Sequence, residues 1–181
     1  MKIVKTKIKD LFIIEPDIFT DNRGWFVETY NKEKFKDLGI DCDFIQDNHS
    51  FSKEKGTLRG LHFQKNPHDQ SKLVRCTKGA VLDVAVDLRK NSPTYKQWVS
   101  IELTAENKKQ FFIPKGFAHG FLTLIDNTEF QYKVDNYYNK LSERCIRYDD
   151  QEIGIDWNNN NPLLLERDKN APFLKDCDVS F

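Results

Sequence analysis

The stretch AVLDVAVDL, residues 80–88, is the clearest structural signal in this sequence, because apolar side chains recur at every second position. A period of two is typical of a β-strand, in which successive side chains point to opposite faces. One face would carry apolar residues throughout: Leu82, Val84, Val86 and Leu88. Asp83 and Asp87 would lie on the other face. Residues 98–103 and 129–135 follow the same pattern, so the sequence predicts an all-β fold.

Turn-forming residues separate these strands. They are Lys78-Gly79, Asn91-Ser92-Pro93, Pro114-Lys115-Gly116 and Asp126-Asn127. Strands at this spacing predict an antiparallel sandwich or barrel. One short helix is expected over residues 31–38, capped by Asn31 and ended by Gly39. Residues 158–161 predict a loop, and residues 162–181 are expected to be mostly irregular with one short helical turn.

Composition narrows the possible functions. The chain has 181 residues, which we interpret as a single domain over residues 1–181. Its 28 Lys and Arg balance 28 Asp and Glu, and a net charge of zero argues against a nucleic-acid-binding protein. No apolar run reaches the roughly 20 residues that a membrane helix needs, and no signal peptide is visible. The 4 cysteines form no CxxC pair, which favours a reduced, cytoplasmic setting.

Three segments concentrate residues that can carry chemistry: 21–28, 46–74 and 113–121. One face of a strand over residues 58–64 would carry Leu58, Gly60, His62 and Gln64. Arg59 would point the other way. If His62 faces the inside of a small barrel, partial burial keeps its imidazole neutral near pH 7, as a general base requires. A carboxylate behind the ring would fix its tautomer, although a structural, hydrogen-bonded histidine is the alternative for His62 taken alone.

Tyr132 interrupts an apolar stripe that includes Phe130 and Val134. A small barrel encloses space for side chains or for one small ligand, so a polar residue on an inward stripe is a candidate for the binding site. The alternative is a core tyrosine whose hydroxyl has found a hydrogen-bond partner.

A metal site is the first alternative to weigh. The spacing from Gly56 to His62 resembles the opening of the first cupin motif, and the run from Pro114 to His119 resembles the second. Metal-binding cupins carry a further histidine two positions after the first. That position is Gln64 here, and an amide is a poor ligand. We therefore expect no tightly bound metal.

Several cations and aromatic residues indicate an anionic, base-containing ligand. The cations suited to a diphosphate are Arg23, Arg59, Lys72 and Arg167. Phe26 and Tyr138 are placed to stack on a base. Arginine beside aromatic residues is also common at protein interfaces, so this pattern is weak by itself.

Taken together, the motifs resemble the dTDP-4-dehydrorhamnose 3,5-epimerase family over residues 8–172. The matching motifs are DxRGxFxE (21–28), QDNHS (46–50), LRGLHFQ (58–64), KLV (72–74), DVAVDLRKNSPT (83–94), IPKGFAHGF (113–121), YKVDNYY (132–138) and RD (167–168). The resemblance implies a cupin-type jelly roll that works without metal and as a homodimer. It also implies inversion of C3 and C5 of dTDP-4-dehydro-6-deoxy-D-glucose to give dTDP-4-dehydro-L-rhamnose. No other cofactor is expected either, since this epimerase chemistry requires none.

The resemblance also implies roles for individual residues. His62 would be the base, oriented by Asp168, and Tyr132 the acid on the opposite face of the sugar. Lys72 would stabilise the enolate oxygen. The residues expected to bind sugar, phosphates and nucleotide are Arg59, His119, Gln46, Asp47, Asn48, Tyr138, Glu143 and Arg167. Those expected from the partner subunit are Arg23, Phe26 and Glu28.

Three alternatives remain at this point. A related enzyme inverts one carbon only, or accepts another nucleotide 4-keto sugar. A metal-dependent cupin oxygenase would contain stoichiometric iron or manganese. A sugar-nucleotide-binding jelly roll without activity would bind its ligand but would not exchange substrate protons with solvent.

Overall fold

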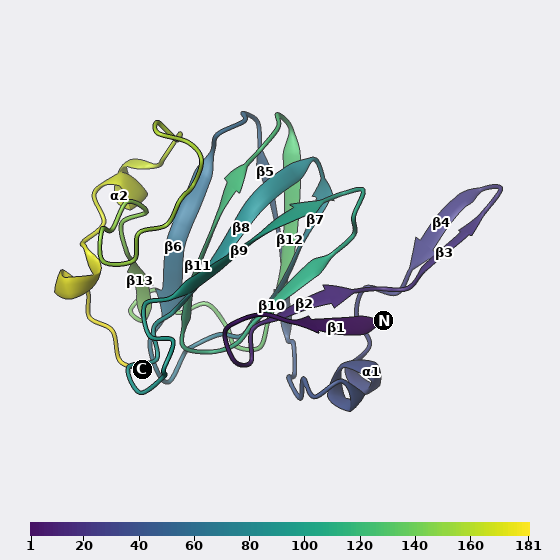
Figure 1. The fold of residues 1–181 in the computed structure, drawn as a ribbon, viewed down its shortest axis with the longest axis horizontal. Helices are drawn as coiled ribbons and strands as arrows, with labels where there is room; N and C mark the ends of the chain where they lie inside the picture. The colour runs from purple at the N-terminus through teal and green to yellow at the C-terminus, as the bar shows by residue number, and fades with distance from the viewer.

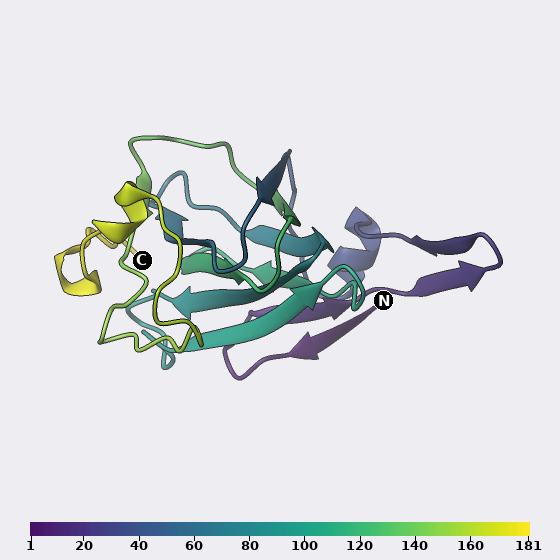
Figure 2. The ribbon, with the colours of Figure 1, turned by 90° about the horizontal axis from the view of Figure 1, so that it is seen from above.

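Two antiparallel sheets face each other in the computed structural model, which describes residues 1–181 (Figures 1 and 2). The larger sheet has the order β1 (Lys2–Lys5), β2 (Phe12–Glu15), β10 (Gln110–Ile113), β7 (Lys72–Lys78), β12 (Thr128–Val134), β5 (Gln46–Ser52). The smaller sheet has the order β13 (Glu143–Cys145), β6 (Leu58–Gln64), β11 (Phe117–Thr123), β8 (Ala80–Asp87), β9 (Trp98–Thr104). The predicted all-β, cupin-type fold is confirmed, in the form of an open sandwich.

The alternating stretch that opened the sequence analysis is β8, and both of its faces are buried. Val84 and Val86 pack on the outer side of the smaller sheet, whereas Val81 and Ala85 pack between the sheets. β8 pairs with β11 on one side and β9 on the other, which places it inside the sheet. The alternation in β8 therefore assigns side chains to two different buried layers. It does not separate buried residues from exposed ones. Asp83 is fully buried as a result.

The C-terminal segment covers the outer face of the smaller sheet (Figure 1). It contains α2 (Glu166–Lys169) and the 3-10 turn η1 (Leu174–Asp176), one more helical turn than the sequence predicted. Trp157 and Leu174 pack there against the same core cluster as Val84. This cover fixes α2 beside β6, where the functional site lies.

The predicted helix is confirmed as α1 (Lys32–Asp37). The side chain of Asn31 accepts a hydrogen bond from the Lys34 backbone N–H at 3.2 Å, and Gly39 follows the helix with a φ of +90°. None of the helices is long and apolar enough to cross a lipid bilayer.

A hairpin of β3 (Ile18–Asp21) and β4 (Gly24–Val27) projects from the body of the molecule (Figures 1 and 2). Its large apolar side chains are exposed: 61% of Phe19, 60% of Trp25 and 67% of Phe26. Apolar groups gathered on a projecting element typically mark an interaction surface.

The pairing of β6 with β11 contains a register shift at Gly60 and Leu61. His62 pairs with His119 and Arg59 pairs with Phe121, so two residues of β6 face the single residue Gly120. This β-bulge reverses the side-chain alternation on one side of the shift. The sequence-based prediction that Leu58 shares a face with His62 is therefore wrong: Leu58 packs in the outer core, and Arg59 reaches β5 across the gap between the sheets.

Candidate active site

A cavity of about 170 Å³ opens between the two sheets at the end where β6, β7 and β12 approach each other. Its lining contains seven of the predicted site residues: Gln46, Asn48, His62, Lys72, Tyr132, Tyr138 and Glu143. These residues come from five strands and one loop that are far apart in the sequence. The imidazole and the phenol that the acid–base prediction requires thus line one cavity.

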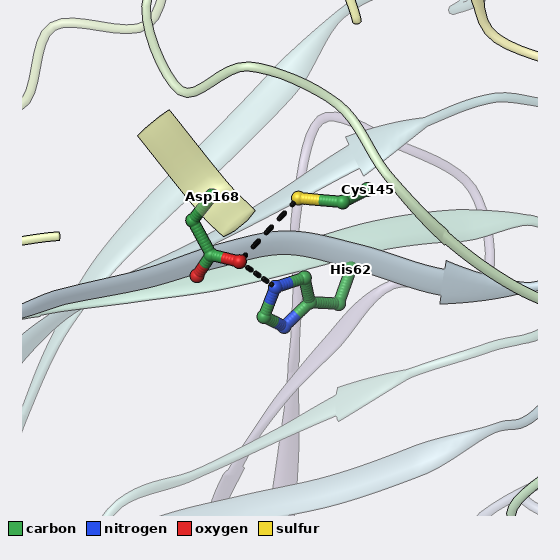
Figure 3. Close-up of side chains that lie close together, drawn as sticks. All are labelled: His62, Cys145 and Asp168. Carbon is green, nitrogen blue, oxygen red and sulfur yellow. Dashed lines mark hydrogen bonds and ion pairs between the residues drawn. The ribbon is translucent and has the colours of Figure 1, made fainter. Parts of the chain in front are cut away.

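His62 is paired with Asp168 (Figure 3). The His62 Nε2 atom lies 2.9 Å from Asp168 Oδ1. The Asp168 carboxylate is buried and belongs to α2, within the C-terminal segment. A carboxylate accepts only, so the Nε2 atom carries the proton and the Nδ1 atom has a free lone pair. Figure 3 shows the Nδ1 side of the ring turned away from Asp168. The pair therefore presents a base whose tautomer is fixed by a carboxylate.

Asp168 is kept ionised by its surroundings. Burial alone would raise its pKa, but hydrogen bonds from His62, the Gly60 backbone N–H and Arg167 outweigh burial and hold the pKa below its usual value. The Gly60 N–H lies 3.4 Å from Oδ2, so the β-bulge also contributes to the site. An ionised Asp168 stabilises the imidazolium that forms when His62 takes up a proton.

Arg167 connects the reacting end of the site to the predicted nucleotide end. Its Nε atom lies 3.2 Å from Asp168 Oδ1, and its Nη1 atom lies 3.1 Å from Glu143 Oε2. The Tyr138 hydroxyl donates to the same Glu143 oxygen at 3.0 Å. The guanidinium also lies 3.1 Å from His62 Nε2. Because the hydrogen on Nε2 points to Asp168, this contact brings two hydrogen-bond donors close together and is not itself a hydrogen bond.

Lys72 and Tyr132 supply a cation and a neutral phenol to the cavity. Burial lowers the pKa of Lys72 to about 8, while the carboxylates of Asp83 and Glu143 act in the opposite direction. Lys72 takes part in no ion pair, so its ammonium group is available to a ligand. Burial also raises the pKa of Tyr132, which keeps its hydroxyl protonated.

His119 lies deeper, between the sheets, and does not line the cavity. Its Nε2 atom is 3.0 and 2.9 Å from the two carboxylate oxygens of Asp83. Burial lowers the pKa of His119, so the imidazole is neutral and donates from Nε2. Arg59 binds the Ser52 side chain and the Phe51 carbonyl on β5 instead of facing the cavity directly.

Four more of the predicted site residues lie away from the cavity, on the hairpin, at its base or on the outer face of the larger sheet. Arg23 and Phe26 are on the projecting hairpin, where Arg23 pairs with Asp21 at 2.6 Å, and Glu28 pairs with Lys34 at 2.7 Å at its base. Asp47 was grouped with Gln46 and Asn48 in the sequence analysis, but adjacent strand residues face opposite ways. The structure places Asp47 on the outer face of the sheet, where it pairs with Lys133 at 2.8 Å.

Asp83 and Gln64 are among the polar residues of the site region that sequence analysis did not assign to it. Asp83 was assigned only to the polar face of its strand, because alternation cannot reveal that both faces are buried. Gln64 was treated only as a poor metal ligand. Its amide in fact accepts from the Asn139 N–H at 2.7 Å and donates to the Tyr137 carbonyl at 3.1 Å, and so holds the loop that carries Tyr138.

The site does not suit a bound metal ion. The ligand atoms of His62, Cys145 and Asp168 lie within 4.8 Å of one another, but the Arg167 guanidinium already occupies the space beside two of them. Burial raises the pKa of Cys145 to about 12, which keeps its sulfur a neutral thiol. A cation placed there would meet a positive charge and a protonated ligand.

A β-sandwich with a histidine–carboxylate pair, a neutral phenol and an unpaired ammonium group around one cavity defines an acid–base isomerase. Comparison with known proteins identifies the family to which the chain belongs. The family model for dTDP-4-dehydrorhamnose 3,5-epimerase matches residues 5–176, and the chain belongs to this family.

Individual relatives agree along nearly the whole chain. The dTDP-4-dehydrorhamnose 3,5-epimerase of Shigella flexneri is 51% identical over 98% of this chain and 98% of its own length. The crystal structure of the Elizabethkingia anophelis enzyme is 52% identical, with a TM-score of 0.93 and 97% of each chain covered. The Legionella pneumophila enzyme, solved with dTDP-4-keto-L-rhamnose, is 46% identical with a TM-score of 0.93, and covers 98% of this chain and 94% of its own.

Proposed function

We propose that this chain converts dTDP-4-dehydro-6-deoxy-D-glucose to dTDP-4-dehydro-L-rhamnose by inverting C3 and C5, a step of dTDP-rhamnose biosynthesis. The observation that carries the proposal is the placement of His62, Lys72 and Tyr132 around one cavity, with Asp168 behind His62. The full-length relatives named for this reaction support the same conclusion.

The chemistry of the substrate explains why these residue types are needed. The C4 ketone acidifies the hydrogens on C3 and C5. The His62 Nδ1 atom removes one of them, and Asp168 stabilises the resulting imidazolium. The negative charge moves to the C4 oxygen, where the Lys72 ammonium group stabilises it in a cavity with little water. Tyr132 then returns a proton from the opposite face, which inverts the carbon.

The remaining residues bind the substrate in this proposal. Gln46, Asn48 and Tyr138 line the nucleotide end of the cavity. Arg167 and Glu143 bridge from that end to the base, and Arg167 supplies a cation for a diphosphate. Arg59 and His119 are assigned to the sugar and phosphates as well, although neither side chain lines the cavity in the free protein.

We further infer a homodimer in which the hairpin reaches the partner's site. Arg23 and Phe26 lie on the hairpin of β3 and β4, which projects from the body of its own chain (Figure 1), and the hairpin's apolar side chains are exposed. Glu28 at the hairpin's base would enter with them. The four free cysteines fit a reducing, cytoplasmic location.

Incubation with the substrate in deuterated water tests the reaction. Double inversion predicts deuterium at both C3 and C5 of the product, seen by proton NMR. Label at one carbon would reduce the function to a single-centre epimerase. A complete lack of exchange, with binding retained, would indicate a binding protein. Loss of activity on chelation, with stoichiometric iron or manganese, would favour the oxygenase.

A further inference from the structure

Asp83 is a buried carboxylate whose charge is not balanced by its only hydrogen-bond partner. It has no exposed surface, and both of its oxygens contact His119 Nε2. Burial keeps His119 neutral, as its lowered pKa indicates. A buried carboxylate that receives a hydrogen bond only from a neutral group is costly, so a cation is expected nearby.

Lys72 is the complementary case. It lies on β7, in the sheet that faces β8, and its ammonium group has no ion-pair partner. His62 on β6, Tyr132 on β12 and Glu143 on β13 line the same cavity as Lys72, and Asp83 on β8 and His119 on β11 interact electrostatically with it from between the sheets. Only Asp83 and Glu143 among these are carboxylates.

Of the two carboxylates, only Asp83 carries a charge that no other cation balances, so it is the one that can act mainly on Lys72. Glu143 lies 3.1 Å from the Arg167 guanidinium and also accepts from Tyr138, so its charge is already balanced. Asp83 has no Arg or Lys within ion-pair distance. In accordance with this, Asp83 raises the pKa of Lys72 more strongly than Glu143 does, against the effect of burial.

We propose that Asp83 is a positioning residue for the epimerase reaction: held by His119, it supplies the buried negative charge that keeps Lys72 an ammonium ion beside the enolate oxygen. The inference rests on the proposed function, since it assigns Asp83 to the group that would stabilise the enolate. It also gives a role to the carboxylate that lies between Val81 and Ala85 on the inner face of β8.

The protonation of Lys72 can be measured without substrate, by competitive acetylation with acetic anhydride across a pH series and peptide mass spectrometry. The test variant is Asp83→Asn, which retains an oxygen that accepts from His119 Nε2 but loses the charge. The matched control is Glu143→Gln. We expect the Lys72 midpoint near pH 8 in the wild type, a lower midpoint in Asp83→Asn and a smaller change in Glu143→Gln. An unchanged midpoint in Asp83→Asn, or an equal change in the control, would overturn the proposal.

Turnover gives a second readout. If the Lys72 pKa falls by one unit in Asp83→Asn, the ratio of the variant's rate to the wild-type rate should drop roughly sixfold between about pH 6.5 and 8.5. A merely structural role would give the same ratio at every pH, which would contradict the proposal. Failure of the wild type to exchange protons would remove the proposed function, yet the acetylation result for Asp83 would stand.

A folding defect in Asp83→Asn would itself be informative. If the variant unfolds because Lys72 has lost its counter-charge, the double variant Asp83→Asn/Lys72→Met should regain stability, because a buried ammonium group without a partner is then also removed. Urea unfolding of both single variants and the double variant measures this coupling. If the double variant loses as much stability as the two single variants added together, Asp83 and Lys72 are not coupled and the proposal is wrong.

Discussion

Tyr132 and His62 reach the same cavity from opposite sheets, and this placement separates their roles. A base on one face of the sugar can remove a proton and return it to the same face without inversion. Inversion needs a second donor, and burial keeps the Tyr132 hydroxyl protonated by raising its pKa. In the proposed reaction, two different residues of the cavity wall therefore carry the two proton transfers.

Replacing Tyr132 by Phe should separate exchange from inversion. The variant keeps the ring, so the cavity shape is preserved, while the proton donor is lost. We expect product formation to fall by roughly 10²–10⁴-fold, whereas recovered substrate still acquires deuterium from deuterated water through His62. Proton NMR of substrate and product measures both. Undiminished product formation would exclude Tyr132 as the acid, and His62→Asn, which should lose exchange as well, is the control.

The ionisation of Lys72 predicts an alkaline limit to activity. In the proposed reaction its ammonium form stabilises the enolate, and burial lowers the pKa of Lys72 to about 8. The active, protonated form is thus present below this pH and is lost as the pH rises through it. The rate at saturating substrate should fall above about pH 8, well before Tyr132 ionises. In Lys72→Met the residual rate should not fall in this way above about pH 8. If the alkaline fall persists in the variant, another group causes it.

At the scale of elements, local pattern predicted the strands and the α1 cap, but not the direction of every side chain. Alternation located β8, β9 and β12 because each is a continuous strand. It misplaced Arg59, since the bulge in β6 depends on Gly120, which lies on a distant segment and pairs only in the folded sheet. The error at Asp47 has another origin. Strand alternation alone predicts that Asp47 points to the opposite face from Gln46 and Asn48, but the motif match grouped the three residues together.

Gly60 makes this bulge possible, and its substitution should be costly. Its φ is +134°, and a Cβ atom there would lie 2.5 Å from Gly120 Cα. Gly60→Ala should reduce the free energy of unfolding by about 2–4 kcal/mol, from backbone strain and the clash with the facing backbone. Gly39→Ala is the control, because its φ is also positive, at +90°, but no atom lies within 4 Å of the added Cβ. Urea unfolding of both variants checks the prediction, and equal losses would show that the close approach to Gly120 carries no cost of its own.

At the scale of the whole molecule, the projecting hairpin decides whether one chain holds a complete site. The cavity gathers the acid–base residues from one protomer. Arg23 and Phe26 do not line it, and the hairpin that carries them extends from the sandwich (Figure 2). The family resemblance predicted a site shared between two protomers, but no pattern in the sequence explains why it would be shared. The reason is geometric: the short strands β3 and β4 pair only with each other and leave the sandwich.

Mixing two inactive variants tests this division directly. His62→Asn disables the base, and Arg23→Ala removes the hairpin cation. If the hairpin completes the partner's site, a mixed dimer has one site with both defects and one with neither. Equal amounts of the two variants, unfolded and refolded together, should therefore recover about a quarter of the wild-type sites. Each variant refolded alone is the control. If the mixture recovers no activity although mass spectrometry detects mixed dimers, Arg23 acts within its own chain and the shared site is wrong.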